Sequence, residues 1–300
     1  MVSSPEGYTG GWTRRVGRWL PMMALLAAGI ASATPQRIVS INLCADQLLM
    51  TLLPRERLIS VTHLAADPTQ SMMAGQARGV PVNHGRADEV VRLKPDLVVA
   101  GRYSQTQTVA LLRALGIPVL ELDVPSSTEQ LIKQMDDLGQ RLGVSQTAHI
   151  EIERFRRALD ELDRSELPNR PLAALYRVNR GTEGRDTLIG ELMHRAGMRN
   201  VADELGVRRW GTLPMESLLL AQPDIIIVEQ SSDRQPAMAH QFLRHPALRR
   251  LLAETQTALL DSRDWSCAGP WLTRPLAQLV QTRARWSDAL TEPATVQTPP

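Results

Sequence analysis

The residue types that most often perform chemistry in proteins are few in this sequence and lie far apart. There are six His and two Cys among 300 residues, and they never fall at the spacing of a metal site. The short motifs of serine hydrolases, phosphate-binding loops, dinucleotide-binding folds and zinc peptidases are also absent. We therefore predict a protein that is not an enzyme and has no metal ion held directly by its own side chains.

The remaining candidate residues follow predicted strands. In parallel α/β sheets the loops at the carboxyl ends of the strands line the ligand crevice. Aromatic faces there could cover a large flat ligand, and arginines could pair with its carboxylates or other oxyanions. Any one of these side chains could equally belong to the core or to the solvated surface, so their shared placement carries the prediction. The candidate ligand-binding residues are Cys44, His63, His84, Arg102, Tyr103, Tyr176, Arg177, Trp210, Trp265 and Cys267.

Two similar stretches, residues 88–100 and 216–228, organise the elements that must position these side chains. Each contains a short amphipathic segment, a Pro-Asp pair and a run of four aliphatic residues. Proline ends a helix and biases the residue before it toward an extended conformation. An apolar run without alternation is typical of a strand covered on both faces, as in a parallel sheet. The repeat therefore predicts two α/β lobes built on one plan.

The order of predicted elements divides the chain into two lobes and a connector. We expect an N-terminal lobe at 34–142, a connecting segment with one long amphipathic helix at 143–167, and a C-terminal lobe at 168–290. Within the lobes we expect, among other elements, strands at 37–41, 58–61, 97–100, 117–122, 172–178, 225–228 and 258–260, a first helix at 47–53, and loops at 179–186 and 230–236. The tail at 291–300, with three prolines, is expected to be disordered.

The N-terminus has the features of an export signal. Arg14, Arg15 and Arg18 precede an apolar stretch at 19–30, and Ala31-Ser32-Ala33 fits a cleavage site, so residues 1–33 are predicted to be a signal peptide cleaved after Ala33. The apolar stretch of twelve residues is shorter than the ~20 that a membrane-spanning helix needs. We expect an exported periplasmic protein, and both Sec and twin-arginine export fit the sequence.

The charge of the chain gives no sign of nucleic-acid binding. The net charge is +2, and residues 1–33 alone carry three Arg and one Glu, so the rest holds 31 basic and 31 acidic residues. With neither a basic stripe nor a nucleic-acid motif, we exclude nucleic acid as a partner.

The assembled pattern resembles a known family. The export signal, the two similar lobes, the long connecting helix and the sequences at 37–43 and 94–99 are similar to those of the periplasmic binding proteins for vitamin B12 and iron–siderophores. These are the helical-backbone (class III) proteins that serve ABC importers. The resemblance covers residues 37–285. It implies an α/β fold of two lobes with mainly parallel sheets flanked by helices, joined by one long interdomain helix, with a ligand cleft between the lobes.

The resemblance also implies roles for particular residues. In the family each lobe presents an acidic residue, usually Glu, to arginines of the membrane permease. By position these residues are Asp88 and Glu216, each seven residues before a Pro-Asp proline, and neighbouring Glu89 could share the role of the shorter Asp88. Trp265 corresponds to a Trp of the last loop in B12 binders. The aromatic that follows the Lys-Pro-Asp strand in those proteins is Gly101 here, which leaves the chelate undetermined.

Cys44 and Cys267 are not explained by the resemblance. The mature protein would lie in an oxidising compartment, which permits a disulfide. A disulfide, two free thiols and a direct contact with ligand all fit the sequence.

These expectations define one function. The chain is predicted to be a monomeric substrate-binding protein, with no cofactor of its own, that captures a bulky metal chelate (a ferric siderophore or cobalamin) and delivers it to the ABC importer permease in the inner membrane. The alternatives are a direct metal-ion or haem receptor of the same architecture and, less favoured, a periplasmic α/β enzyme.

Overall fold

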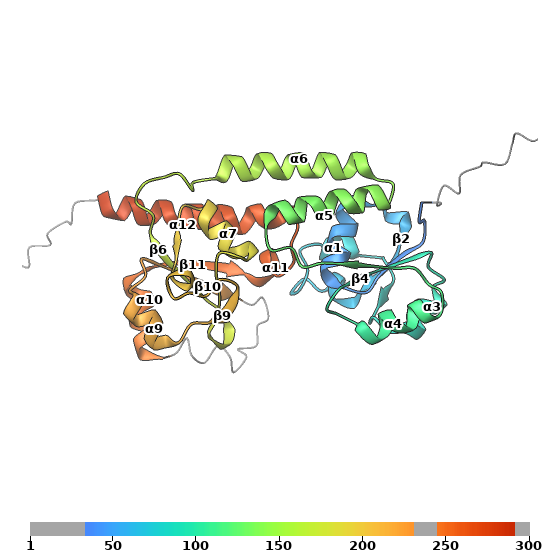
Figure 1. Ribbon diagram of the computed structural model, residues 1–300, viewed down its shortest axis with the longest axis horizontal. Helices are drawn as coiled ribbons and strands as arrows, with labels where there is room; N and C mark the ends of the chain where they lie inside the picture. Colours follow the sequence, from blue (N-terminus) through green and yellow to red (C-terminus); the bar gives the residue numbers. More distant parts are fainter. Residues whose placement is uncertain (1–33, 231–244, 292–300) are drawn as a thin grey trace, which may run out of the picture. The chain divides into compact units, whose positions relative to one another are not determined.

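Two parallel β-sheets form the framework of the protein in the computed structural model (Figure 1). The structure describes residues 34–230 and 245–291. The predicted signal peptide, most of the loop expected at 230–236 and nearly all of the tail expected at 291–300 lie outside the described residues.

The first sheet has five strands in the order β3-β2-β1-β4-β5, and all neighbouring strands are parallel. Its strands are β1 (Ile38–Ser40), β2 (Leu58–Thr62), β3 (Val82–Asn83), β4 (Leu97–Gly101) and β5 (Val119–Leu122). The helices between them are α1 (Leu43–Leu52), α2 (Ala74–Ala77), α3 (Ala87–Arg92) and α4 (Thr106–Ala114), with 3₁₀ turns at Arg55–Arg57 and His63–Ala66.

The second sheet has four parallel strands in the order β11-β10-β6-β8, and a short antiparallel ribbon, β7-β9, accompanies it. The strands are β6 (Leu172–Tyr176), β7 (Gly181–Glu183), β8 (Arg199–Asn200), β9 (Trp210–Thr212), β10 (Ile225–Gln230) and β11 (Gln256–Asp261). The helices are α7 (Leu188–Arg195), α8 (Val201–Glu204), α9 (Met215–Ala221), α10 (Pro246–Glu254) and α11 (Ser262–Trp265), with 3₁₀ turns at Val178–Arg180 and Pro270–Leu272.

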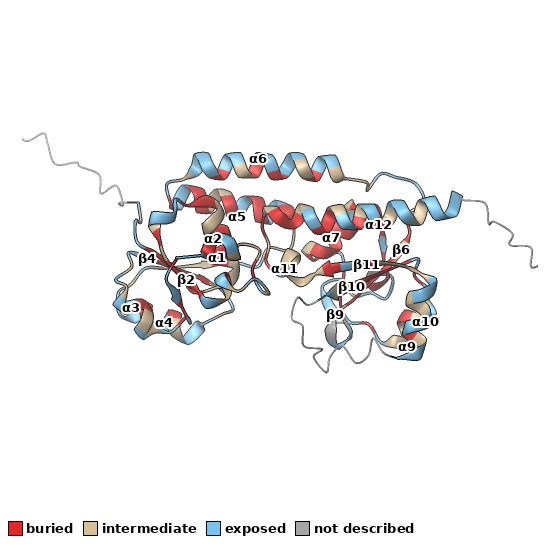
Figure 2. Cartoon of the chain, turned by 180° about the vertical axis from the view of Figure 1, so that it is seen from behind, coloured by how far each residue is buried: buried red, intermediate tan, exposed pale blue. Residues whose placement is uncertain are grey.

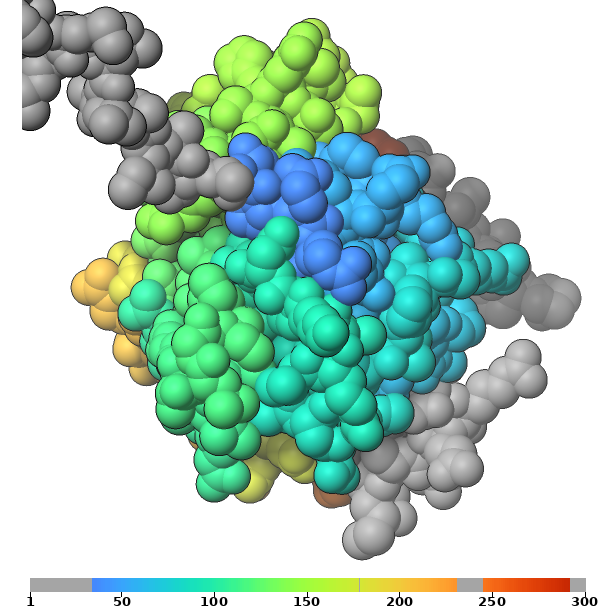
Figure 3. All heavy atoms as spheres, turned by 90° about the vertical axis from the view of Figure 1, so that its right-hand side faces the viewer, coloured from blue at the N-terminus to red at the C-terminus, as the bar shows by residue number. Residues whose placement is uncertain are grey.

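Three long helices, α5 (Thr128–Arg141), α6 (Ser145–Leu162) and α12 (Thr273–Thr291), pack on one another beside the two sheets (Figure 1). The side chains of α6 that are buried recur every three or four residues, which gives the helix one apolar stripe (Figure 2). They are Ala148, Ile152, Phe155 and Leu159. In the end-on view of Figure 3, α6 lies above the residues of the first sheet and its helices.

One hydrophobic core runs from the first sheet to the second through these helices. The same cluster of buried side chains includes Ile38 of β1, Leu131 of α5, Phe155 of α6, Leu175 of β6 and Leu276 of α12. The predicted fold class, two lobes of parallel sheets flanked by helices with a long helix between them, is confirmed. The lobes are joined by a shared core, however, rather than by α6 alone. The exact lobe boundaries stay a prediction.

The sequence repeat corresponds to the same structure in both sheets. The residue before each Pro-Asp proline, Lys94 or Gln222, has a positive φ of 48° or 45°. The extended conformation expected there was therefore wrong, and a left-handed residue lies between each helix and its proline instead. The carboxylate of Asp96 accepts the backbone N–H of Arg37 at 2.9 Å, and that of Asp224 accepts the N–H of Leu172 at 2.8 Å. In both sheets the aspartate thus joins the start of its own strand to the start of the neighbouring strand.

Two local predictions were wrong for identifiable reasons. The first helix starts at Leu43, four residues earlier than expected, because the Asn42 side chain accepts the backbone N–H groups of Cys44 and Ala45 and caps it there. The segment expected as a loop at 179–186 contains β7, which pairs with β9. The two strands have three residues each, too short to show a two-residue alternation of apolar side chains.

Candidate ligand-binding site

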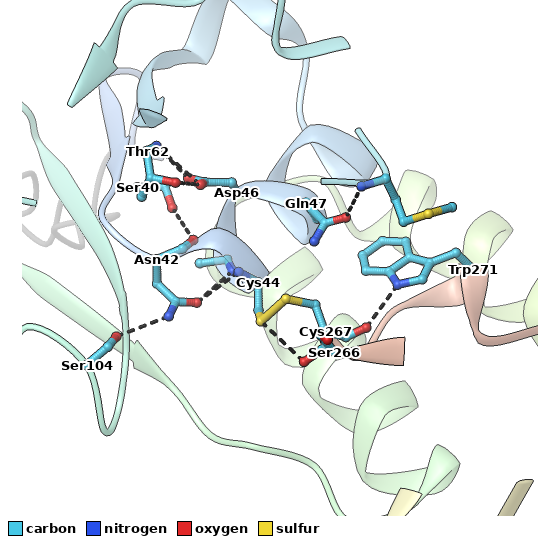
Figure 4. The surroundings of a disulfide bond; sticks show 12 residues. Ser40, Asn42, Cys44, Asp46, Gln47, Thr62, Ser104, Ser266, Cys267 and Trp271 are labelled. Carbon is cyan, nitrogen blue, oxygen red and sulfur yellow. Dashed lines mark hydrogen bonds between the residues drawn. A yellow bond between two sulfur atoms is a disulfide. The ribbon is translucent and has the colours of Figure 1, made fainter. Parts of the chain in front are cut away.

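The start of α1 is fixed at the carboxyl end of β1 by Asn42. Its Oδ1 accepts the N–H groups of Cys44 and Ala45 at 3.0 and 3.1 Å, and its Nδ2 donates to the Ser104 hydroxyl at 3.1 Å (Figure 4). A Cβ atom at Gly101 would lie 2.7 Å from Asn42 Nδ2, so this arrangement requires the glycine. The close approach is a physical reason for the absence of an aromatic side chain at this position.

Cys44 and Cys267 form a disulfide bond (Figure 4). Of the three possibilities that the sequence left open, the structure therefore selects the disulfide. Cys44 lies in the first turn of α1 and not in a loop, whereas Cys267 is buried between α11 and the last 3₁₀ turn. The backbone carbonyl of Cys267 also accepts the indole N–H of Trp271 at 2.9 Å. The bridge thus connects an element that follows the first sheet's β1 to one that follows the second sheet's β11.

Asp46, in the same turn of α1, is a buried carboxyl group. It is fully buried, and its Oδ2 accepts the Thr62 hydroxyl at 2.5 Å while both oxygens accept the Thr62 N–H at 3.2 Å (Figure 4). Burial raises the pKa of Asp46 to about 6, although hydrogen bonds from Ser40 and Thr62 and the nearby His63 oppose the rise. The group anchors α1 to β2 beneath the site and has no surface to offer a ligand.

Arg177, which follows β6, is held by two carboxylates. Its Nε and Nη2 each donate to Glu229 at 3.1 Å, and its Nη1 donates to Glu183 at 2.5 Å. Burial alone would lower the pKa of the guanidinium, but the hydrogen bonds and charges of Glu229 and Glu183 raise it above its usual value. The predicted role of Arg177 as a free partner for anionic ligands is therefore not supported by its geometry, because its donors already bind carboxylates.

Two tryptophans lie near this cluster. The Arg177 guanidinium lies 4.7 Å from the centre of the Trp265 ring, a cation–π contact that fixes both side chains. The Trp265 Nε1 is buried and has no hydrogen-bond partner among the described residues. Trp210, on β9, is 60% exposed, and the guanidinium of Arg209 lies 4.8 Å from its ring centre.

Six of the ten predicted ligand-binding residues line two neighbouring hollows. A hollow of about 210 Å³ is lined by Arg177, Trp210 and Trp265 from the second sheet. A hollow of about 220 Å³ is lined by Cys44, Arg102 and Tyr103 from the first. The two hollows share the lining residues Val124, Pro125, Ser266 and Ala268. We call the pair the interlobe hollow.

The side chains of the interlobe hollow differ in how far they are available. Tyr103 is 78% exposed and presents its ring at the rim. Arg102 forms an ion pair with Asp123, with Nε 2.5 Å from Oδ1, so this arginine is also paired with a carboxylate. Tyr103, Trp210 and Trp265 supply the aromatic rings among the described residues that line the hollow.

Four predicted site residues do not line the interlobe hollow. The rings of His63 and His84 stack with their centres 4.7 Å apart, and His84 Nδ1 lies 3.2 Å from Glu89. The two histidines thus meet, as the loop positions suggested, but away from the hollow. Tyr176 is fully buried in the core of the second sheet, and Cys267 is buried behind Ser266 and Ala268. For these four residues a direct contact with ligand stays a prediction without support from the geometry.

The predicted docking acids occupy matching positions. Asp88 and Glu216 are each the second residue of their helices, α3 and α9, and both are exposed. Asp88 pairs with Arg86 at 3.1 Å and with Arg92 at 2.7 Å, and the hydrogen bond from Arg86 lowers the pKa of this carboxyl. Glu89 instead accepts the backbone N–H of His84 at 2.7 Å and holds the loop before α3.

Three charged residues of the site were not predicted. Glu183, Glu229 and Asp123 each bind an arginine of the interlobe hollow. Glu229 lies at the end of β10 and Asp123 directly follows β5, so the rule that carboxyl ends of strands line a crevice would have included both. Glu183 lies on the unpredicted β7 and had no comparable sequence signal.

Across residues 34–230 and 245–291, no three His, Cys, Asp or Glu side chains come together as a metal site. In the same ranges, no helix combines the length and the apolar character needed to cross a bilayer.

The two parallel sheets, their shared core and a hollow between the carboxyl ends of their strands define a two-lobed α/β binding protein. The model of a periplasmic binding protein family matches residues 38–259. The chain belongs to this family, and the resemblance inferred from the sequence is thereby confirmed. Two curated relatives, each named cobalamin-binding protein and from strains of Halobacterium salinarum, are 24% identical over a match 264 residues long that covers 85% of this chain and 69% of each relative.

Solved structures with the same fold carry different ligand names. A possible iron-binding protein from Staphylococcus epidermidis has a TM-score of 0.70 at 17% identity, covering 83% of this chain and 99% of that one. The haem-binding protein RhuT from Roseiflexus has a TM-score of 0.67 at 22% identity, covering 85% and 98%. The vitamin B12 binding protein BtuF of Vibrio cholerae has a TM-score of 0.63 at 17% identity, covering 86% and 99%. These likenesses show the fold.

Proposed function

We propose that this chain is the periplasmic substrate-binding protein of an ABC importer and that it binds a bulky metal chelate without chemical turnover. The observation that carries the proposal is the interlobe hollow, to which the loops of both sheets contribute aromatic rings and which the disulfide adjoins. The names of the curated relatives and of the solved structures support a chelate such as cobalamin or haem.

The size of the hollow favours a ligand that bridges the two sheets. Its halves, of about 210 and 220 Å³, are each smaller than the ~300–1,000 Å³ typical of small-molecule pockets. A small ligand could occupy one half alone, whereas a macrocyclic chelate would lie across both and contact Tyr103 on one side and Trp210 on the other.

The test is a binding panel. Purified mature protein is titrated with cobalamin, haem and several ferric siderophores, with thermal shift and calorimetry as readouts. We expect one class to bind, and Tyr103→Ala and Trp210→Ala each to weaken it by about tenfold or more, because an aromatic ring contributes much contact area. Leu115→Ala, which removes an exposed apolar side chain at the end of α4, serves as the matched control. Failure of every chelate to bind would overturn the proposal.

We further propose that Asp88 and Glu216 dock the importer permease. Their matching exposed positions on α3 and α9 support this, because two acidic residues at equivalent positions can pair with two equivalent cationic residues of a partner. Asp88 must exchange its contacts with Arg86 and Arg92 to do so, whereas no ion pair of Glu216 is found among the described residues. Glu216 is therefore expected to contribute more.

The docking proposal is tested by charge reversal. Asp88→Lys with Glu216→Lys should abolish uptake in cells that depend on this protein while ligand affinity is unchanged, and Glu216→Lys alone should reduce uptake more than Asp88→Lys alone. Glu166→Lys, at an exposed acid between α6 and β6, controls for the change in net charge. Uptake that survives the double reversal would remove both residues from the docking surface.

A further inference from the structure

Every arginine that lines the interlobe hollow is paired with carboxylate. On the second sheet's side, Arg177 is 31% exposed and lies between Glu183 and Glu229, whose side chains are 10% and 11% exposed. On the first sheet's side, Arg102 pairs with Asp123 at 2.5 Å. Arginine is usually the residue that recognises anionic groups of a ligand, but here Nε, Nη1 and Nη2 of Arg177 already donate to glutamates, and Nε of Arg102 lies against Asp123.

The net charge around the half of the hollow that Trp265 lines can be counted from these ion pairs. Arg177 contributes one positive charge, and Glu183 and Glu229 contribute two negative charges. The Arg209 guanidinium lies 4.8 Å from the Trp210 ring centre and at most neutralises the one remaining negative charge. Among residues 34–230 and 245–291, no uncompensated positive charge therefore faces a ligand in this half of the hollow.

An anionic group placed here would meet two obstacles. It would lie beside Glu183, which lines the hollow, and near Glu229, which is bound to Arg177, and their repulsion is weakly screened in a partly buried site. To bind Arg177 it would also have to displace one of them, and this would leave a nearly buried carboxylate without its partner. A neutral polar group, such as a carboxamide, or a cationic group meets neither obstacle.

We propose that Glu183 and Glu229 determine ligand specificity by selecting chelates whose edge on the Trp265 side is uncharged or cationic and by rejecting those that present carboxylate there. The inference rests on the proposed function, because it concerns the same hollow. It narrows the ligand class from metal chelates in general to chelates with amide-like or cationic groups at that edge. The two glutamates act through charge and through their hold on Arg177.

The experiment compares ligands that differ by one charge at constant shape. Cobalamin and its monocarboxylic acids, in which one side-chain amide is hydrolysed, are titrated against wild-type protein, Glu183→Gln and Glu229→Gln. We expect at least one monocarboxylic isomer to bind the wild type about tenfold or more weakly than cobalamin, the size of one charge interaction at short range in a partly screened site. Each Gln variant should shrink that ratio several-fold. Thermal denaturation verifies folding, and Glu166→Gln is the control for net charge.

The outcomes separate the two proposals. If all isomers bind the wild type as tightly as cobalamin, or if neither Gln variant reduces the discrimination, the specificity inference is wrong while the binding function stands. If haem binds and cobalamin does not, the same comparison is made between haem and its dimethyl ester, whose two propionates are masked, and tighter binding of free haem by the wild type would overturn the inference. If no chelate binds, both proposals fall.

Discussion

The disulfide between Cys44 and Cys267 should be the largest single contribution to stability that one chemical change can remove. It joins residues 223 apart, and closing a loop of that length lowers the entropy of the unfolded chain enough to stabilise the fold by about 5 kcal/mol in the chain-entropy model. The native state should survive its loss, because the continuous core already holds the two sheets together. We expect the free energy of unfolding to fall by about 3–5 kcal/mol in a Cys44→Ala, Cys267→Ala double variant.

Urea denaturation followed by tryptophan fluorescence measures this loss, since the chain has six Trp. Reductant should bring the wild type close to the stability of the double variant and should leave the double variant unchanged. Replacing buried Cys267 also removes some packing, so the reduced wild type isolates the effect of the bridge itself. Equal stability of oxidised and reduced wild type would refute the reasoning, as would a variant that loses its native fold.

Three further changes test other parts of the structure. Because the pKa of Asp46 is raised to about 6 in the folded state, the free energy of unfolding should fall by about 3 kcal/mol as the pH rises from below 4 to above 6. Between pH 4 and pH 8 the stability of Asp46→Asn should therefore rise relative to that of the wild type by about the same amount, as measured by paired denaturation curves. A stability difference that does not change with pH would contradict this. Gly184→Ala should destabilise the protein strongly, because the added Cβ would lie 1.8 Å from the backbone oxygen of Val207. Gly75→Ala is the control and should have little effect, because a Cβ there would meet open space. Similar melting temperatures for the two variants would be evidence against the tight contact at Gly184. Asn42→Ala removes the cap of α1 and should cost about 1–2 kcal/mol by chemical denaturation, with a negligible loss counting against the cap.

The fold could be predicted because its strands are buried on both faces and because a Pro-Asp pair precedes a strand in each sheet. The aliphatic runs after Pro95 and Pro223 form β4 and β10, which are interior strands of their sheets. The structural role of the aspartate that follows each proline could not be predicted, since it binds a backbone N–H 59 residues away in one copy and 52 in the other. The local sequence pattern was thus enough to predict the helices and strands. The reason why the Pro-Asp pair repeats became visible only from its long-range hydrogen bonds.

The candidate site was predicted only in part, for a related reason. The carboxyl-end rule placed Arg177, Trp210 and Trp265 together, because it depends on topology alone. It did not show that Arg177 is paired, since Glu229 lies 52 residues away and Glu183 lies on a ribbon without apolar alternation. Aromatic and cationic side chains were considered as ligand contacts, while the acids that neutralise them were overlooked. Charge balance in a site depends on partners that only the fold brings together.

The same residues that build the interlobe hollow also limit how far its two sides can separate. Ser266 and Ala268, which line both halves, flank Cys267, and the bridge to Cys44 pins them to the first turn of α1. A second tie joins the start of α5 to α7, where the Thr128 N–H and hydroxyl donate to Glu191 at 2.7 and 2.5 Å.

A third tie joins the Arg263 guanidinium to the carbonyl of Pro68 at 2.6 Å. With these contacts and a continuous core, wide opening of the lobes would break several interactions at once. A ligand is therefore selected by a largely preformed surface, in which the fixed charges of Glu183 and Glu229 can discriminate because Arg177 has little freedom to rearrange.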